Sequence, residues 1–155
     1  MSTPTELTFT QGSTANSRNA IYKGYRYGNP NQLKSGYTSW ECVLKKCKGR
    51  IHTIGDGTVE VTRVHKHEPS IEECQVKLAM NAARQLAATT RTEPTVIMAD
   101  TTTDLSDVAR ALLPNKVART KQIWRARHDV DGRPRAPTSV IDMNINPSDC
   151  ITSNG

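Results

Sequence analysis

Apolar and polar positions follow two different periods along the chain, and the change falls near residue 68. Before it, large apolar side chains lie in short runs that predict strands at Leu7–Thr10, Ala20–Gly28, Tyr37–Val43, Gly49–Ile54 and Thr58–Val64. In the last run Val59 and Val61 point one way and Glu60 and Thr62 the other, a period of two. This pattern is typical of an antiparallel sheet with one face buried.

Two segments between these runs predict turns or loops. Gly55-Asp56-Gly57 is a strong signal for a short hairpin between the last two strands. Asn29–Gly36 is polar and rich in turn-forming residues, which predicts a loop. On the strand Tyr37–Val43, Trp40 and Cys42 fall on one face.

After residue 68 the pattern favours helices. Ser70-Ile71-Glu72-Glu73 has the form of a capping box and predicts a helix to about Thr89. Its apolar side would hold Val76, Ala79, Ala83 and Leu86. Ser106–Leu113 predicts a short helix that Pro114 stops, and Asn115–His128 predicts a third helix, whereas Thr95–Ala99 is ambiguous. We expect Leu86, Leu112, Val117, Ile123 and Trp124 to hold these helices together.

The predicted fold class is therefore α+β: a small antiparallel β-sheet module followed by a short helical region. Its parts are a flexible arm (1–18), the sheet module (19–68), a helical accessory region (70–128) and an extended tail (129–155). A further strand is possible in the tail at Ser139–Ile145. A sheet module this small usually needs a cross-link, such as a disulfide or a bound metal, in addition to its core.

The net charge of +6 lies entirely in residues 22–67, within the sheet module. Residues 22–67 hold nine basic and three acidic side chains, whereas basic and acidic side chains balance before and after this segment. A compact module with such an excess is the electrostatic footprint of a protein that binds polyanions.

The four cysteines, Cys42, Cys47, Cys74 and Cys150, could form two disulfides. However, the first residues (MSTPTELTFTQGST) are polar, and no apolar run approaches membrane-spanning length. We therefore expect the protein to be intracellular, in a reducing environment, and not to bind a membrane. There, paired cysteines more often bind metal than oxidise.

Two of these cysteines combine with two histidines in a metal-ligand pattern. Cys42-x4-Cys47 precedes His65-x-His67, and tetrahedral Zn²⁺ takes four such N or S ligands. On a continuing strand both histidine rings would project from one face. The alternative is two buried thiols and two histidines with ordinary partners. Cys74 is a competing ligand or, more in keeping with its predicted helix, a packed thiol, and Cys150 is expected to be free.

Residues 9–67 resemble a known family, the FLYWCH-type zinc finger. The matching elements are Phe9, Gly24-Tyr25-Arg26-Tyr27, Trp40-Glu41-Cys42, Cys47-Lys48-Gly49-Arg50 and His65-Lys66-His67. Ile21 stands at the usual Leu position, and the ending is His-Lys-His where His-Asn-His is usual. Residues 70–145 loosely resemble the helical region that follows FLYWCH modules in transposon-related and nematode or insect proteins.

The resemblance implies a zinc module similar to the WRKY and GCM domains, which read the DNA major groove with one strand. The corresponding element here is Gly24–Gln32, although the WRKYGQK signature is absent. Candidate base-reading residues are Arg26, Asn29, Asn31 and Lys34, and candidate phosphate contacts are Lys45, Lys46, Lys48 and Arg50. The alternative for the basic cluster is a solvated surface that keeps the module soluble. The alternative for the asparagines is that they only form the turn. The acid-free helix Asn115–His128 is a second DNA contact or, as we prefer, a solvated face.

These features predict zinc-dependent, sequence-specific binding of double-stranded DNA in the nucleus by a transcriptional regulator or repressor. The alternative is a protein-interaction module of a chromatin- or transposon-derived factor, with chromatin proteins as partners. An enzyme with a small-molecule substrate is not expected. A four-ligand zinc leaves no open position, and the chain has no phosphate-binding Gly loop or nucleophile signature.

Overall fold

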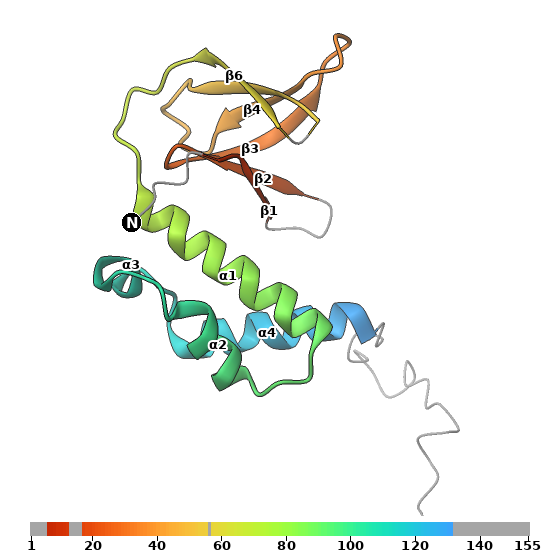
Figure 1. Ribbon diagram of the computed structural model, residues 1–155, viewed down its shortest axis with the longest axis vertical. Coiled ribbons are helices and arrows are strands. Elements are labelled where there is room, and N and C mark those ends of the chain that lie inside the picture. Colours follow the sequence, from red (N-terminus) through yellow and green to blue (C-terminus); the bar gives the residue numbers. More distant parts are fainter. Residues whose placement is uncertain (1–5, 13–16, 56, 132–155) are drawn as a thin grey trace, which may run out of the picture.

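The computed structural model describes residues 6–12, 17–55 and 57–131 (Figure 1). Six strands come first, and four helices follow. The strands are β1 (Thr8–Gln11), β2 (Arg18–Tyr22), β3 (Tyr25–Gln32), β4 (Thr38–Cys42), β5 (Arg50–Ile54) and β6 (Thr58–Arg63). The helices are α1 (Ile71–Thr89), α2 (Pro94–Thr102), α3 (Asp107–Ala111) and α4 (Lys116–Asp131). The α+β fold class is thereby confirmed.

The strands form one antiparallel sheet in sequence order, β1 to β6. The single strand expected at Ala20–Gly28 is wrong, because a two-residue turn divides it into β2 and β3. Lys23 and Gly24 both have positive φ, 50° and 78°, as a type I′ hairpin turn requires. A Cβ on Gly24 would also lie 2.9 Å from that of Pro69, so this turn and the entry to α1 pack closely.

Strand β3 runs further than expected and enters the segment predicted as a loop. Gly28 pairs with Glu41 and Asn31 with Ser39, so one extra residue bulges out of β3. Asn29, at φ 50°, absorbs the bulge. Residues 29–32 are exposed, and the β3–β4 hairpin projects from the rest of the sheet at the upper right of Figure 1.

The sheet has a small aromatic core. Ala20, Tyr27, Trp40 and Ile51 are buried, and half-buried apolar residues including Phe9 pack around them. The Trp40 indole N–H donates to Thr53 Oγ1 at 3.0 Å, which satisfies the buried donor. Trp40 and Cys42 are both buried, as expected of one face of a strand. On β6, Val59 packs against the core but Val61 is 48% exposed, so only the first follows the expected alternation.

Helix α1 begins at Ile71, as predicted, but without the predicted capping box. The Ser70 side chain makes no capping hydrogen bond. Its backbone N–H donates instead to Gly24 O at 2.9 Å, which ties the helix start to the β2–β3 turn. The segment that was ambiguous in sequence belongs to α2, which has Pro94 in its first turn. Helix α3 does have a serine cap, since Ser106 Oγ accepts from Ala109 N–H at 3.2 Å.

The helices enclose a second core, separate from that of the sheet. It consists of Ala83, Ala87, Ile97, Met98, Ile123 and Ala126. Of the residues expected to hold the helices together, Ile123 alone is buried; Leu86, Leu112, Val117 and Trp124 are 38 to 62% exposed. Alanines replace them at the contact, because small side chains let α1 and α4 approach closely.

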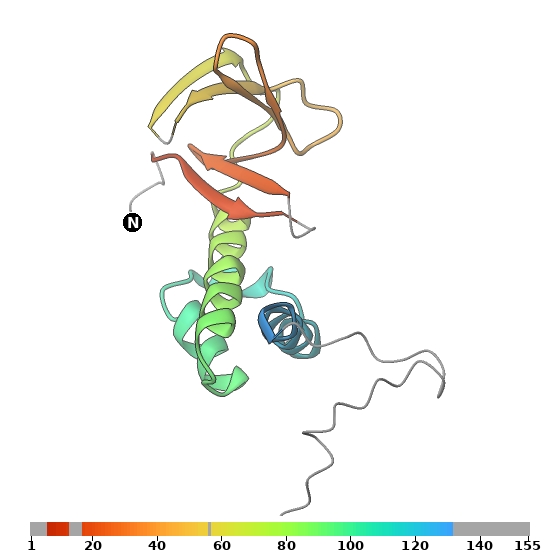
Figure 2. The same cartoon turned by 90° about the vertical axis from the view of Figure 1, so that its right-hand side faces the viewer.

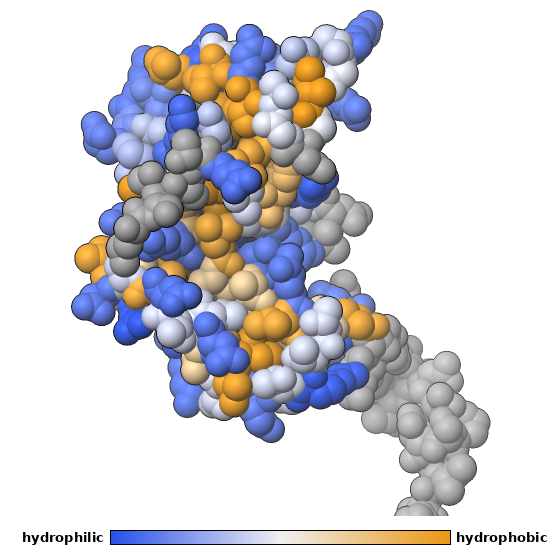
Figure 3. Space-filling model, viewed as in Figure 1, coloured by the Kyte–Doolittle hydropathy of each residue, from blue (hydrophilic) through white to orange (hydrophobic). Residues whose placement is uncertain are grey.

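Helix α1 joins the two cores. It runs from below the sheet to the other helices, and α4 is seen end-on beside it in Figure 2. Gln11 N–H donates to Asn81 Oδ1 at 3.1 Å, and Arg84 donates to Gln11 Oε1 and Gly12 O. On the face shown in Figure 3, apolar residues form a band from the sheet to the helices.

The tail prediction is wrong at its start, because α4 includes residues 129–131. The remainder of the tail, with the expected strand Ser139–Ile145 and Cys150, lies outside the described residues. None of the described helices combines the length and the apolar character that crossing a membrane requires.

Candidate metal centre

The two cysteines lie on either side of a tight turn between β4 and β5. Cys42 ends β4, and its backbone N–H donates to Gly49 O at 2.9 Å. Cys47 N–H donates to Leu44 O at 2.8 Å, which closes the turn. The four-residue spacing therefore returns the chain so that both thiols face the same space.

The two histidines follow the end of β6 at Arg63, on an irregular segment and not on a continuing strand. Their rings nevertheless meet. His65 Nδ1 and His67 Nε2 lie 3.2 Å apart, and the ring planes are at 81° to each other. Each histidine thus presents a different nitrogen to the same point.

All four predicted ligands come together in one group, with their ligand atoms within 4.8 Å of one another. Cys42 Sγ is 3.4 Å from His67 Nε2, and Cys47 Sγ is 3.4 Å from His65 Nδ1. A zinc tetrahedron with Zn–S of about 2.3 Å and Zn–N of about 2.05 Å has S–N edges of about 3.6 Å and N–N edges of about 3.3 Å. The donor set and the spacing therefore fit Zn²⁺.

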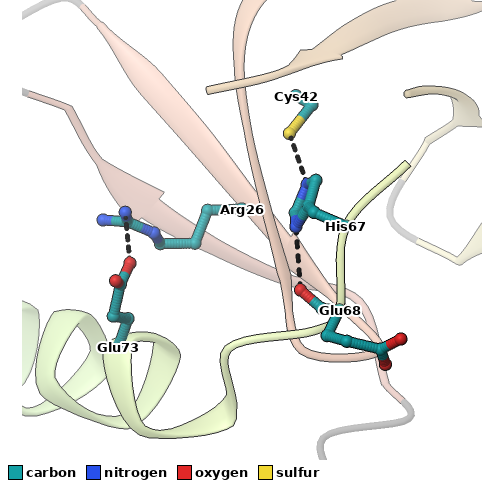
Figure 4. Close-up of polar contacts among 5 residues, drawn as sticks. All are labelled: Arg26, Cys42, His67, Glu68 and Glu73. Atoms are coloured by element: carbon teal, nitrogen blue, oxygen red, sulfur yellow. Dashed lines mark hydrogen bonds and ion pairs between the residues drawn. The ribbon is translucent and has the colours of Figure 1, made fainter. Parts of the chain in front are cut away.

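The histidine nitrogens that face away from this point have partners of their own. His65 Nε2 lies 2.7 Å from Tyr27 Oη, and His67 Nδ1 lies 2.8 Å from Glu68 O (Figure 4). A carbonyl only accepts, so His67 carries its proton on Nδ1 and leaves Nε2 free to bind a metal. Outer partners of this kind orient ligating histidines.

Tyr25 and Gly49 hold the ring of His65 between them. The Tyr25 ring stacks on it with centroids 3.7 Å apart and planes at 4°, and Tyr25 Oη donates to His67 O at 3.2 Å. On the other side, a Cβ on Gly49 would lie 2.5 to 2.9 Å from ring atoms of His65. Sequence reasoning expected Tyr25 in the core and missed this role, although the Gly-Tyr-x-Tyr spacing places Tyr25 and Tyr27 side by side at the site.

The pKa values of the two thiols are shifted in opposite directions by their surroundings. Burial raises the pKa of Cys42 above the ordinary thiol value. At Cys47, burial is outweighed by backbone N–H groups of Lys66 and Gly49, and the pKa is lowered. Burial, and then the neighbouring His67, lower the pKa of His65 and favour its neutral, ligating form.

Cys74 does not belong to this group, and no second group of three or more candidate ligands occurs in the described part of the chain. Its thiol is fully buried on α1, and burial raises its pKa to about 11. The prediction of a packed thiol is thus confirmed.

Beside the metal centre lies a hollow of about 690 Å³ lined by six basic side chains and one acidic one. The basic residues are Arg18, Lys45, Lys48, Arg50, Arg63 and Lys77; the acidic residue is Glu41, which is paired with Arg50. Within the described residues, the other five basic side chains form no ion pair. Burial, and then Arg84 and Arg26, lower the pKa of Lys77.

The predicted DNA-binding residues are distributed around this hollow. Asn29, Lys45, Lys48 and Arg50 line it. Asn31 lies in a neighbouring shallow depression with Asn29 and Arg50. Lys34, in the hairpin loop, and Lys46 are exposed and are not among the lining residues.

Arg26 faces elsewhere. Its guanidinium forms an ion pair with Glu73 of α1 at 2.7 Å, as Figure 4 shows. Sequence reasoning also missed Arg18, Arg63 and Lys77 as members of the hollow. They come from three separate elements, β2, β6 and α1, and only the folded chain brings them together.

Comparison with known proteins gives one match. The profile of the FLYWCH zinc finger domain family matches residues 12–67, a segment that contains all four candidate ligands. Searches of curated proteins and of solved structures gave no match. The family pattern and the converging ligands agree, and the chain therefore contains a FLYWCH zinc finger domain at residues 12–67.

Proposed function

We propose that the four ligands hold a structural Zn²⁺, and that the folded finger binds double-stranded DNA in a sequence-specific manner. In this proposal the protein acts in the nucleus as a regulator or repressor of transcription. The metal supplies the link that fixes β4, the following turn and the end of β6 to one another. Residues Cys42, Cys47, His65 and His67 hold it.

A structural metal fits the ligand count better than a catalytic one. Four protein ligands complete a zinc tetrahedron, whereas catalytic zinc keeps one position for water or substrate. The two histidines are further restrained by Tyr27, Tyr25 and Glu68. We therefore do not assign an enzymatic reaction to this centre.

The observation that carries the DNA proposal is the basic hollow. Five of its basic side chains, which come from strands, from the cysteine turn and from α1, form no ion pair with any described residue. Bringing like charges together creates a mutual repulsion that raises the free energy of the fold. A polyanion such as the DNA backbone relieves it and releases counter-ions.

The β3–β4 hairpin is the element best placed to read bases. It projects from the sheet (Figure 1), and its residues Asn29 and Pro30 line the hollow. A two-stranded ribbon fits the major groove, which is about 12 Å wide. Asn29 and Asn31 are exposed on it, and asparagine can pair with the edge of adenine through two hydrogen bonds. The similarity to WRKY and GCM domains supports the same docking mode.

The alternative is a protein-interaction module on a chromatin- or transposon-derived factor. The finger offers exposed apolar side chains for such a contact: Val43 and Leu44 at the hollow are 39% and 48% exposed, and Val64, after β6, is 76% exposed. The two functions differ in their salt dependence, because phosphate contacts weaken steeply with salt and apolar contacts do not.

The test is a selection of bound duplexes from a random pool, followed by affinity measurements at several salt concentrations. Lys45→Gln or Lys48→Gln should weaken binding to all duplexes and lower the salt slope by about 0.9 for each phosphate that is no longer neutralised. Asn31→Ala should cost about 1–3 kcal/mol on the selected site only. Lys116→Gln, at an exposed position of α4, is the matched control.

A finger that is loaded with zinc but shows no salt-sensitive duplex binding would overturn the DNA proposal and favour the interaction module. If the lysine variants lose affinity but no sequence is enriched, the protein binds DNA without reading bases. The proposal that binding is sequence-specific would then be wrong.

A further inference from the structure

The outward face of α4 carries an exposed stripe that the zinc finger does not use. Val117, Lys121, Trp124 and His128 lie at positions i, i+4, i+7 and i+11, which places them in one row along the helix. All four are exposed, with Val117 at 62% and Trp124 at 57%. Arg125 lies beside this row and is also exposed.

The tryptophan is held in place on the surface. The Arg127 guanidinium lies 5.4 Å from the centroid of its ring, within the range of a cation–π contact. Arg127 is itself 7% exposed and donates to the carbonyl oxygen of Thr92. The opposite side of α4 is already packed through Ile123 and Ala126. A large indole is therefore presented to solvent in a restrained orientation.

The charge around the tryptophan has one sign. From Lys116 to His128, α4 contains no acidic residue, and Lys121 and Arg125 adjoin Trp124 along the exposed face. Neither of these two side chains forms an ion pair with another described residue. An apolar anchor between unpaired cations is complementary to apolar side chains flanked by carboxylates.

We propose that this face of α4 docks an acidic amphipathic helical segment of another protein. Apolar side chains of the partner cover Trp124 and Val117, and its carboxylates pair with Lys121 and Arg125. Tryptophan and arginine are the residues that most often dominate the energy of protein interfaces. Spacing at i, i+4 and i+7 is that of helix-on-helix recognition.

Duplex DNA is the less suitable occupant of this face. Interfaces with DNA are polar and strongly positive, and they gain little from covering an indole and a valine. The face also lies on the helical end of the molecule, away from the projecting hairpin (Figures 1 and 2). The proposal is independent of whether the finger binds DNA.

The experiment uses the full zinc-loaded chain and a synthetic peptide in which Glu and Asp flank Leu and Phe at helical spacing. The chain has two tryptophans, of which Trp40 is 3% exposed and Trp124 is 57% exposed. Binding should shift the tryptophan emission to the blue and protect it from acrylamide. Trp124→Phe should abolish this change, because Trp40 is already shielded.

Variants then separate the two parts of the surface, with affinity measured by anisotropy of the labelled peptide. Trp124→Ala and Lys121→Glu should each weaken binding more than about tenfold, the size expected of central interface residues. Val96→Ala, at another exposed apolar residue on α2, should leave it unchanged. Circular dichroism establishes that each variant keeps its helices.

Several results would overturn the proposal: no binding of the acidic peptide, equal binding of a scrambled peptide, or unchanged affinity in both variants. A random-sequence duplex that protects Trp124 while the peptide does not would assign the face to nucleic acid. None of these results depends on the finger, so the DNA proposal stands or falls separately.

Discussion

At the scale of single residues, the metal centre depends as much on its neighbours as on its four ligands. Tyr27 and Glu68 occupy the outward nitrogens of the histidines, and Tyr25 stacks on the ring of His65. These contacts restrict each histidine to the orientation in which the ligand atoms converge. The metal affinity should therefore respond to residues that never touch the metal.

Gly49 provides the sharpest test of this view. In Gly49→Ala the new Cβ would meet the His65 ring at 2.5 to 2.9 Å, so the ring must move away from the site. We expect zinc affinity, measured by competition with a chromophoric chelator, to fall about 10–100-fold, as for other outer residues. Gly57→Ala is the control, since nothing lies within 4 Å of its Cβ. Equal affinities of the two variants would contradict the geometry.

Acid should release the metal. Burial and His67 lower the pKa of His65, so the folded state holds fewer protons on this ring than the unfolded state below the ordinary value of 6.5. The associated stability is present above pH 6.5 and is lost as the pH falls through the lowered value. Zinc release followed against pH should thus begin only below about pH 6.5. Release that is complete at neutral pH would be inconsistent with a half-buried, neutral His65.

Trp124 illustrates where sequence reasoning failed at a single position. The helical pattern suggested a buried ring, and its removal would then cost about 3–5 kcal/mol. The ring is 57% exposed, so Trp124→Ala should cost less than about 1 kcal/mol in urea unfolding. Ile123→Ala, with 1% exposure, should cost about 2–5 kcal/mol. The reverse order would mean that the indole is packed in solution.

At the scale of elements, local signals predicted the helix and strand types well and the boundaries less well. The β5–β6 hairpin and the extent of α1 follow from Gly55-Asp56-Gly57 and from the apolar spacing after Ser70. The β2–β3 turn was missed because three tyrosines outweighed the Lys23-Gly24 pair. The ligand set was predictable because cysteine and histidine spacing is itself the chemical signal.

Other features could not be predicted because they depend on contacts between distant segments. Ser70 fits a capping box by sequence, but its backbone is engaged by Gly24, more than forty residues earlier. The basic hollow needs Arg18, Arg63 and Lys77 from different elements. Alanines form the helix contact because it is close, and spacing alone does not distinguish a close contact from one filled by leucines.

The junction between finger and helices gives an element-scale prediction. Arg26 and Glu73 form an ion pair whose side chains are 34% and 48% exposed. A double-mutant cycle with Arg26→Ala and Glu73→Ala should yield a coupling of about 0.2–1 kcal/mol in stability. If Arg26 serves this junction alone, Glu73→Ala and Arg26→Ala should change DNA affinity equally little. A loss of DNA affinity that occurs only in Arg26→Ala, and only for one DNA sequence, would show that Arg26 reads a base.

At the scale of the whole molecule, the two hydrophobic cores have different sources of stability. The finger combines a small aromatic core with the metal centre, whereas the helices pack on one another through a core without candidate ligands. Structural zinc contributes roughly 10–16 kcal/mol of apparent binding free energy in finger peptides. Loss of the metal should therefore affect the two halves unequally.

Chelation should unfold the sheet while the helices persist. The far-ultraviolet circular dichroism signal of helix should remain after zinc removal, while hydrogen exchange in β3, β4 and β5 should become fast. Cys42→Ala should have the same effect without a chelator, and Cys74→Ala, outside the ligand group, should retain zinc. Simultaneous unfolding of the sheet and the helices would show that α1 is not stably folded without the finger.

The most direct test of the central claim is duplex binding by the same protein preparation before chelation, after it and after return of one equivalent of zinc. We predict salt-sensitive binding that disappears with the metal and returns with it, because the metal positions the cysteine turn that carries Lys45 and Lys48. Binding that is equally strong without zinc, or absent when the site is full, would contradict the account.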